Sequence, residues 1–163
     1  MLLAQKRIPD IGRRWACWSL VERRAGLQAD AGRSLLRAAW ACDDAKRGEW
    51  AEVFRNRVLD AFQAVQDAGG VFAENRAVEE LVLVDLLRRN GLLVSASHRL
   101  QSLKPADAEG EFDQVAQFQL ALIERRDRRV YTFEDAQSYA ECPEDWQPAP
   151  AKTPWWRRFR LSR

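Results

Sequence analysis

The residues near the C-terminus combine aromatic rings with cations in a segment that contains no acid. The sequence TPWWRRFRLSR occupies residues 153–163. At about 100° per residue in a helix, the rings would lie on one side and most of the arginines on the other. Such a surface can bind a partner through ring burial and through charge together. The predicted partner-binding residues are Trp155, Trp156, Arg157, Arg158, Phe159 and Arg160.

Three kinds of partner fit this chemistry. Another protein subunit with a hydrophobic groove and an acidic rim would accept the rings and pair with the arginines. Single-stranded nucleic acid would stack on the tryptophans and place its phosphates against the arginines. An anionic membrane surface would take the rings at its interface and the arginines at its head groups. In a fourth alternative, the two tryptophans fold back onto the acidic body of the same chain.

The charge of the chain is unevenly distributed. Residues 1–24 have a formal net charge of +4 and residues 149–163 of +5, whereas the intervening residues have −7. Because an acidic body repels polyanions, the distribution excludes a protein that coats nucleic acid over most of its surface. Anion contacts are expected at the two ends. The N-terminal end provides a secondary basic patch, composed of Arg13, Arg14, Arg23 and Arg24.

Few residues in the sequence could perform catalysis. His98 is the one histidine, and no nucleophile motif or carboxylate pair near it in the sequence defines a catalytic role. Cys17, Cys42 and Cys142 lie too far apart in the chain for the close cysteine pairs of a zinc site. No glycine-rich phosphate-binding motif is present. We therefore expect a protein that is not an enzyme and that holds no metal or cofactor.

The cysteine pattern and the hydropathy indicate a location in the cytoplasm. Three widely spaced cysteines are typical of reduced thiols rather than of a disulfide framework. The chain opens with a short apolar stretch that precedes Lys6 and Arg7, which reverses the order found in a secretory signal. Asp85 interrupts the longest apolar run, residues 81–87, so no transmembrane segment is expected. A peripheral contact with a membrane through the tail is compatible with this location.

Four helices are expected in the N-terminal two-thirds of the chain, where apolar residues recur every three or four positions. Asp10 is the expected N-cap of the first helix, Asn75 is that of the fourth, and Gly91 follows the end of the fourth. The apolar residues of the fourth helix surround most of its circumference, so this helix should be the most buried. The predicted ranges are residues 11–26, 30–45, 48–68 and 75–90.

After Gly91 the hydrophobic pattern changes towards the alternation of strands. Apolar residues alternate with others over residues 92–97 and 117–122, and an apolar segment at 130–133 follows the polar sequence RRDRR. These segments predict a small antiparallel sheet or hairpin packed on the helices, which is a mainly helical α+β fold. In the alternative, residues 111–126 form a helix and the fold is an all-α bundle. That helix would use Phe112, Val115, Gln119, Leu122 and Ile123.

Four of the six prolines lie within residues 143–154. Their density predicts a single globular domain over residues 1–142 and a Pro-rich linker with a basic Trp/Arg tail over residues 143–163. With no catalytic constellation and two basic ends, we expect a non-enzymatic adaptor or assembly subunit of a bacterial-type multiprotein complex, recruited to other protein subunits through those ends. The alternative is a nucleic-acid-binding accessory subunit that uses the same arginines.

Overall fold

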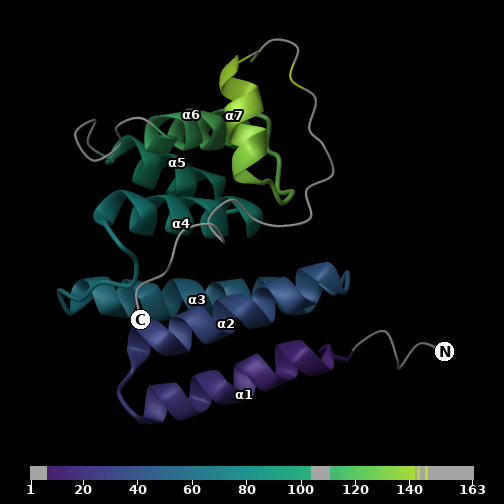
Figure 1. Ribbon diagram of the computed structural model, residues 1–163, viewed down its shortest axis with the longest axis vertical. Helices are drawn as coiled ribbons and strands as arrows, with labels where there is room; N and C mark the ends of the chain where they lie inside the picture. The colour runs from purple at the N-terminus through teal and green to yellow at the C-terminus, as the bar shows by residue number, and fades with distance from the viewer. Residues whose placement is uncertain (1–6, 104–110, 142, 144–145, 147–163) are drawn as a thin grey trace. The chain divides into compact units, whose positions relative to one another are not determined.

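The protein was analysed as a computed structural model that describes residues 7–103, 111–141, 143 and 146. The described residues form seven helices and no strand (Figure 1). The chain divides into two compact units, the first running to Phe72 and the second beginning at Ala73. We refer to them as the N-terminal unit and the C-terminal unit and describe each by itself.

The N-terminal unit consists of three helices, α1 (Asp10–Arg24), α2 (Gln28–Asp44) and α3 (Gly48–Asp67). Short turns join them, so that consecutive helices run in opposite directions (Figure 1). In the turns, Gly26 and Lys46 have positive φ angles of 78° and 55°, which reverse the chain. Helix α2 packs against both α1 and α3 and is therefore the central helix of the unit.

The core of the N-terminal unit lies between α2 and α3. The ring of Phe62 stacks on that of Phe72 with 3.9 Å between ring centroids. Gly32 of α2 leaves room for this pair, because a Cβ atom at position 32 would lie 2.4 Å from Cε1 of Phe62. The residues of α3 that are buried include Ala51, Phe54, Val58, Ala61, Phe62 and Val65.

The C-terminal unit consists of α4 (Arg76–Arg89), α5 (Leu93–Gln101), α6 (Glu111–Glu124) and α7 (Phe133–Glu141). Helix α4 packs against α5 and α6, and α6 packs against α7. The predicted ends of α4 are confirmed. The side chain of Asn75 accepts a hydrogen bond of 2.9 Å from the backbone N–H of Val78, and Gly91, which follows the helix, has a φ of 77°.

The α+β prediction is wrong, and the all-α alternative fits the structure. Residues 93–101 form α5, in which Ala96 and Leu100 are buried four positions apart while Val94 is exposed. The apparent alternation in this segment therefore does not correspond to two faces of a strand. Residues 111–124 form α6, whose buried side chains follow helical spacing. They are Val115, Phe118, Gln119, Leu122 and Ile123.

Two further details differ from the sequence-based expectations. Asp10 does not cap α1, because Pro9 occupies the N-cap position and Asp10 is the first helical residue. Trp146, in the segment predicted as a linker, is 7% exposed. Its ring packs against those of Phe118, Tyr131 and Tyr139, with centroid distances of 5.0 to 5.8 Å. In the described part of the chain, no helix has the length and apolar character needed to cross a membrane.

Candidate functional site

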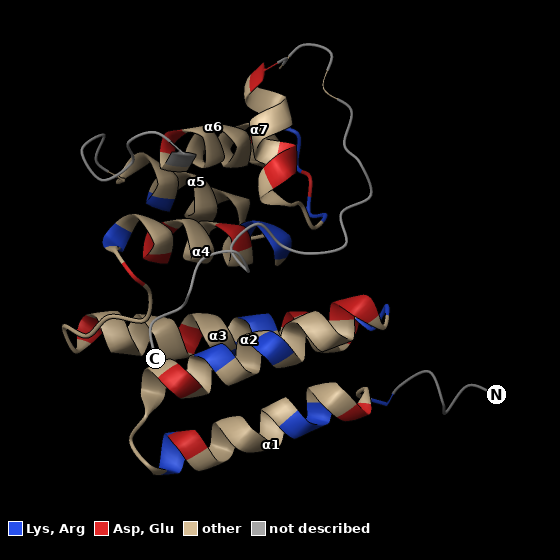
Figure 2. Ribbon diagram, viewed as in Figure 1, with Lys and Arg blue, Asp and Glu red and all other residues tan. Residues whose placement is uncertain are grey.

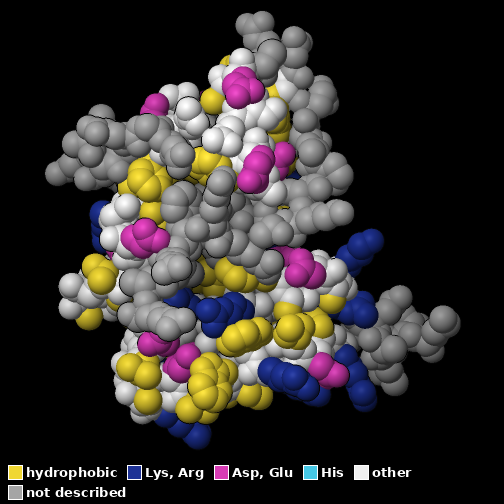
Figure 3. Space-filling model, viewed as in Figure 1, with side chains coloured by type: hydrophobic (Ala, Val, Ile, Leu, Met, Phe, Trp, Pro, Cys, Tyr) yellow, Lys and Arg dark blue, Asp and Glu magenta, His cyan; other side chains and the backbone are white. Residues whose placement is uncertain are grey.

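Helix α1 presents an apolar stripe to solvent. Ile11, Trp18 and Val21 are 59%, 56% and 56% exposed, and only Gly12 and Ser19 of this helix are buried. With Arg14, these residues recur at spacings of three, four and three, so they lie along one side of the helix. We call Ile11, Arg14, Trp18 and Val21 the α1 stripe. Figure 3 shows hydrophobic side chains on the surface of α1 and α2, with Lys and Arg side chains between them.

The buried residues of α1, Gly12 and Ser19, are both small. A Cβ atom added at Gly12 would lie 3.4 Å from the carbonyl oxygen of Ala38 and 3.4 Å from Sγ of Cys42, so the two helices approach closely here. The hydroxyl of Ser19 donates a hydrogen bond of 2.7 Å to the carbonyl oxygen of Ala16 in its own helix. Because α1 approaches α2 closely at Gly12, on the side away from the stripe, the large apolar residues of the stripe are left facing solvent.

In the sequence, Ile11, Trp18 and Val21 recur at helical spacing, but this pattern does not indicate which way the three residues face. Large apolar residues at helical spacing usually mark the side of a helix that enters the core. In α1 a second series, Gly12, Ala16 and Ser19, has the same spacing and takes that role. A stripe of small residues opposite a stripe of large ones is the signal in the sequence that could have revealed the exposed face.

The four arginines of the secondary basic patch are all exposed on α1, but they do not form one patch. Arg13 and Arg14 lie near the start of the helix and Arg23 and Arg24 at its end, ten residues or about 15 Å away. Figure 2 shows the two groups as separate blue segments of α1. Arg13 pairs with Asp10 at 2.7 Å, whereas Arg14, Arg23 and Arg24 have no ion partner among the residues that the structure describes.

One cation from α2 adjoins this surface. The guanidinium of Arg37 lies 4.6 Å from the centre of the Trp15 ring, in a cation–π contact between the two helices. The predicted partner-binding residues of the C-terminal tail all lie outside the described residues. They are Trp155, Trp156, Arg157, Arg158, Phe159 and Arg160.

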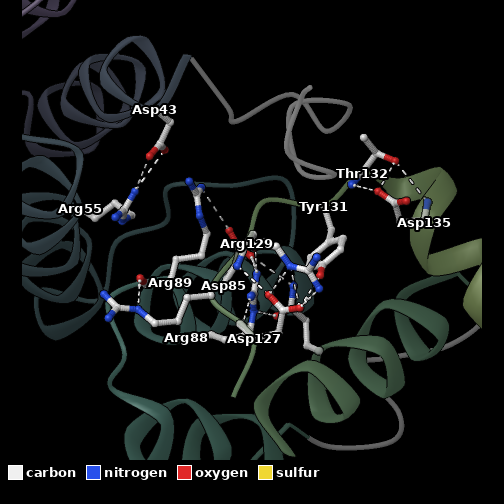
Figure 4. A network of polar contacts seen from close by, with 12 residues as sticks. Asp43, Arg55, Asp85, Arg88, Arg89, Asp127, Arg129, Tyr131, Thr132 and Asp135 are labelled. Carbon is white, nitrogen blue, oxygen red and sulfur yellow. Dashed lines mark hydrogen bonds and ion pairs between the residues drawn. The ribbon is translucent and has the colours of Figure 1, made fainter. Parts of the chain in front are cut away.

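The C-terminal unit contains a buried polar network centred on Arg88 (Figure 4). The side chain of Arg88 is fully buried. Its Nε donates to Oε1 of Gln119 at 2.8 Å, and its Nη2 pairs with Oδ1 of Asp85 at 2.7 Å. Its Nη1 donates to the carbonyl oxygen of Asp127, and Nη2 also donates to that of Arg129 at 3.1 Å. One arginine of α4 thereby fixes both α6 and the segment that follows it.

Asp127 closes the network at its outer edge. It accepts hydrogen bonds from the guanidinium of Arg129 and from the hydroxyl of Tyr131. Burial alone would raise the pKa of Asp127, but the hydrogen bonds from Arg129 and Tyr131 and the charge of Arg129 outweigh it and lower the pKa to about 2. Burial and the bond to Asp127 also raise the pKa of Tyr131. Since each of these groups is bonded to another, we interpret the network as structural.

The other candidates for chemistry are not assembled into a site. His98 is exposed on α5 rather than on a strand. Burial, with a smaller contribution from the charge of Asp43, raises the pKa of the Cys42 thiol to about 11, so this thiol is a poor nucleophile. Cys17 is exposed on α1. Within the described residues, no group of three or more His, Cys, Asp or Glu side chains is arranged to hold a metal ion.

The exposed α1 stripe, whose Arg14 has no ion partner in the described part of the chain, is therefore the feature that most resembles a functional surface. Comparison of the chain with protein-family models, with curated proteins and with solved structures finds no match.

Proposed function

We propose that this chain is a non-enzymatic adaptor or assembly subunit that binds another protein through the α1 stripe. The observation that carries the proposal is the orientation of α1. A helix of 15 residues buries only Gly12 and Ser19 and exposes Ile11, Trp18 and Val21 along one line. Exposed apolar surface of this kind is unfavourable in water at about 25 cal/mol per Å², and covering it is the main gain in most protein association.

The residue types support protein binding in particular. Tryptophan and arginine are the residues most enriched at the positions that dominate the binding energy of protein interfaces. Trp18 and Arg14 are neighbours on the stripe, one helical turn apart. In this proposal the C-terminal tail is a second contact, and two contacts on one chain bind more tightly than either alone because the second becomes intramolecular.

The alternative of a nucleic-acid accessory subunit has less support from α1. A phosphate backbone is best bound by cations that follow it closely. The arginines of α1 are divided between its two ends, and the surface between them includes the apolar side chains of Trp18 and Val21. Apolar aliphatic residues such as isoleucine and valine gain little from contact with phosphates.

Site-specific crosslinking in the cells that produce the protein tests the proposal. A photoreactive phenylalanine analogue replaces Trp18 in one variant and Arg57, an exposed residue of α3, in a matched control. We expect a discrete crosslinked protein from position 18, resistant to nuclease, and none from position 57. Adding Val21→Glu to the position-18 variant should abolish the crosslink. Equal crosslinking from both positions, or no effect of Val21→Glu, would contradict the proposal.

A further inference from the structure

We infer that the partner of the α1 stripe is an amphipathic helix that carries a carboxylate opposite Arg14. The inference rests on the function proposed above and adds the chemistry of the partner. It depends on three observations: the spacing of the stripe, the position of Arg14 within it, and the charge of its surroundings.

The spacing of the stripe is that of a helix that pairs with another helix. Ile11, Arg14, Trp18 and Val21 occupy successive positions separated by three, four and three residues, as do the a and d positions of a two-helix seam. The stripe runs from residue 11 to residue 21, or over about 15 Å of helix. Another helix can therefore contact the α1 stripe along its whole length. An extended peptide would place its side chains at a period of two and would not keep register with it.

Arg14 is one of the residues of the α1 stripe. It lies between Ile11 and Trp18, so any helix that covers those two apolar residues also covers the guanidinium. A cation removed from water without a partner is strongly unfavourable, whereas one paired with a hydrogen-bonded carboxylate is tolerated. A single polar residue at a seam position also fixes register and partner choice. The partner must therefore supply an acid at this point of the seam.

The surroundings of the stripe favour an acidic partner further. Arg14, Arg23 and Arg24 have no ion partner among the described residues, and the carboxylate of Asp10 is taken by Arg13. Glu22 is half-buried, with one carboxylate oxygen shielded from solvent. The exposed charge along α1 is therefore predominantly positive, and a helix with acidic flanks is complementary to it.

The same charge argues against two other occupants. A second copy of α1 would bring the same unpaired arginines to the interface. The C-terminal tail has five cations and no acid in residues 149–163, so it too would be repelled. An anionic membrane attracts the arginines, but Arg14 in the middle of the stripe would have to enter the bilayer together with Trp18, which is costly.

A display selection on the full-length chain tests the inference. The library consists of 18-residue helices with apolar seam positions and randomised residues at one seam position and at the flanks. The Trp18→Glu chain serves for counter-selection. We expect enriched helices to carry Asp or Glu at the random seam position. A selected helix should bind the Arg14→Glu chain at least about tenfold more weakly, and a Lys at the matching position should restore binding. Arg57→Glu, the same charge change away from the stripe, should leave binding unchanged.

The outcomes separate this inference from the proposed function. If the selection enriches helices without an acid and these helices do not bind the Trp18→Glu chain, the inference is overturned and the proposed function is retained. No enrichment over the Trp18→Glu chain would overturn both. Two further results would overturn the inference if no acidic helix bound. The first is binding of the chain to vesicles of phosphatidylserine and phosphatidylcholine, and the second is self-association of the chain in sedimentation, in each case abolished by Trp18→Glu.

Discussion

At the scale of single residues, Gly32 shows how one missing methyl group shapes the N-terminal unit. The ring of Phe62 is fully buried and stacked on Phe72, so it has little freedom to move away from an added Cβ atom. We expect Gly32→Ala to lower the free energy of unfolding by about 1–3 kcal/mol, as overpacked substitutions do. Urea denaturation followed by circular dichroism measures the effect.

A second glycine provides the control for this substitution. At Gly48, the first residue of α3, an added Cβ atom meets nothing within 4 Å. Gly48→Ala should leave stability unchanged or raise it by up to about 1 kcal/mol, because alanine favours the helix. An equal loss of stability in both variants would mean that the Phe62 contact is not the cause.

Arg88 is the residue whose removal should cost the most in the C-terminal unit. Arg88→Met removes the donor to the amide oxygen of Gln119 and the nearer of the two arginines that pair with Asp85, at 2.7 Å against 3.8 Å for Arg89. Breaking a buried ion pair at one partner costs about 3–5 kcal/mol. We expect the double variant with Asp85→Leu to recover part of this loss, since it removes a buried carboxylate that has lost its 2.7 Å ion pair with Arg88. Thermal unfolding of the two variants compares them, and a double variant weaker than the single one would contradict the account.

Asp127 makes the stability of this unit depend on acid. Its pKa is about 2 in the folded chain against an ordinary value of 3.8, so the folded state favours the ionised form. The stabilisation is present above pH 4 and is lost as the pH falls towards 2. We expect Asp127→Asn to melt at a lower temperature than the wild type at pH 6 and to approach it at pH 2. A difference that stays constant between these pH values would rule out ionisation as its origin.

At the scale of elements, α1 and α3 differ in what their apolar residues do. Trp18 is largely exposed, whereas Phe62 is fully buried. We expect Trp18→Ser to change the free energy of unfolding by less than about 0.5 kcal/mol, as exposed substitutions do. Phe62→Ala should cost about 3–5 kcal/mol. Comparing the two by chemical denaturation tests whether the stripe is outside the core, and a large loss with Trp18→Ser would place it inside.

The helices that the sequence predicts well are those with strong end signals. Asn75 and Gly91 bound α4 correctly, and Gly69, with a φ of 72°, follows the end of α3. The segments after Gly91 were harder, because Val94 and Ala96 alternate by chance with Ser95 and Ser97. Helix α6 ends at a turn in which Arg126 adopts a φ of 53°, a conformation for which arginine gives no sequence signal.

The candidate site was predicted in part for a related reason. The arginines and large apolar residues of α1 are evident in the sequence, and so is their spacing. Which side of a helix faces its neighbour depends on how closely the two backbones approach. That approach is set by Gly12 against Ala38 and Cys42, a contact between residues far apart in the chain. Hydrophobic periodicity alone carries no information about it.

At the scale of the whole molecule, the chain divides into two units whose stabilities can be tested separately from the tail. Deleting residues 154–163 should leave the melting temperature within about 2 °C of the wild type, because this deletion retains the described residues of both units. Partner binding should fall. A fall of more than about 5 °C in the melting temperature on this deletion would show that the tail is part of the fold.

Trp146→Ala, by contrast, should lower the free energy of unfolding by about 3–5 kcal/mol, since the Trp146 ring packs against three others.

The way α1 is attached has a consequence for how such a protein can diverge. Its contact with α2 includes the close approach at Gly12 and the ring of Trp15, whereas its exposed stripe residues contribute little to folding. Substitutions at positions 11, 14, 18 and 21 can therefore accumulate at low cost in stability and redirect the protein to a new partner. A substitution at position 12 meets α2 directly, and one at position 19 falls on a buried side chain. Selection can thus alter recognition and folding almost independently within one helix.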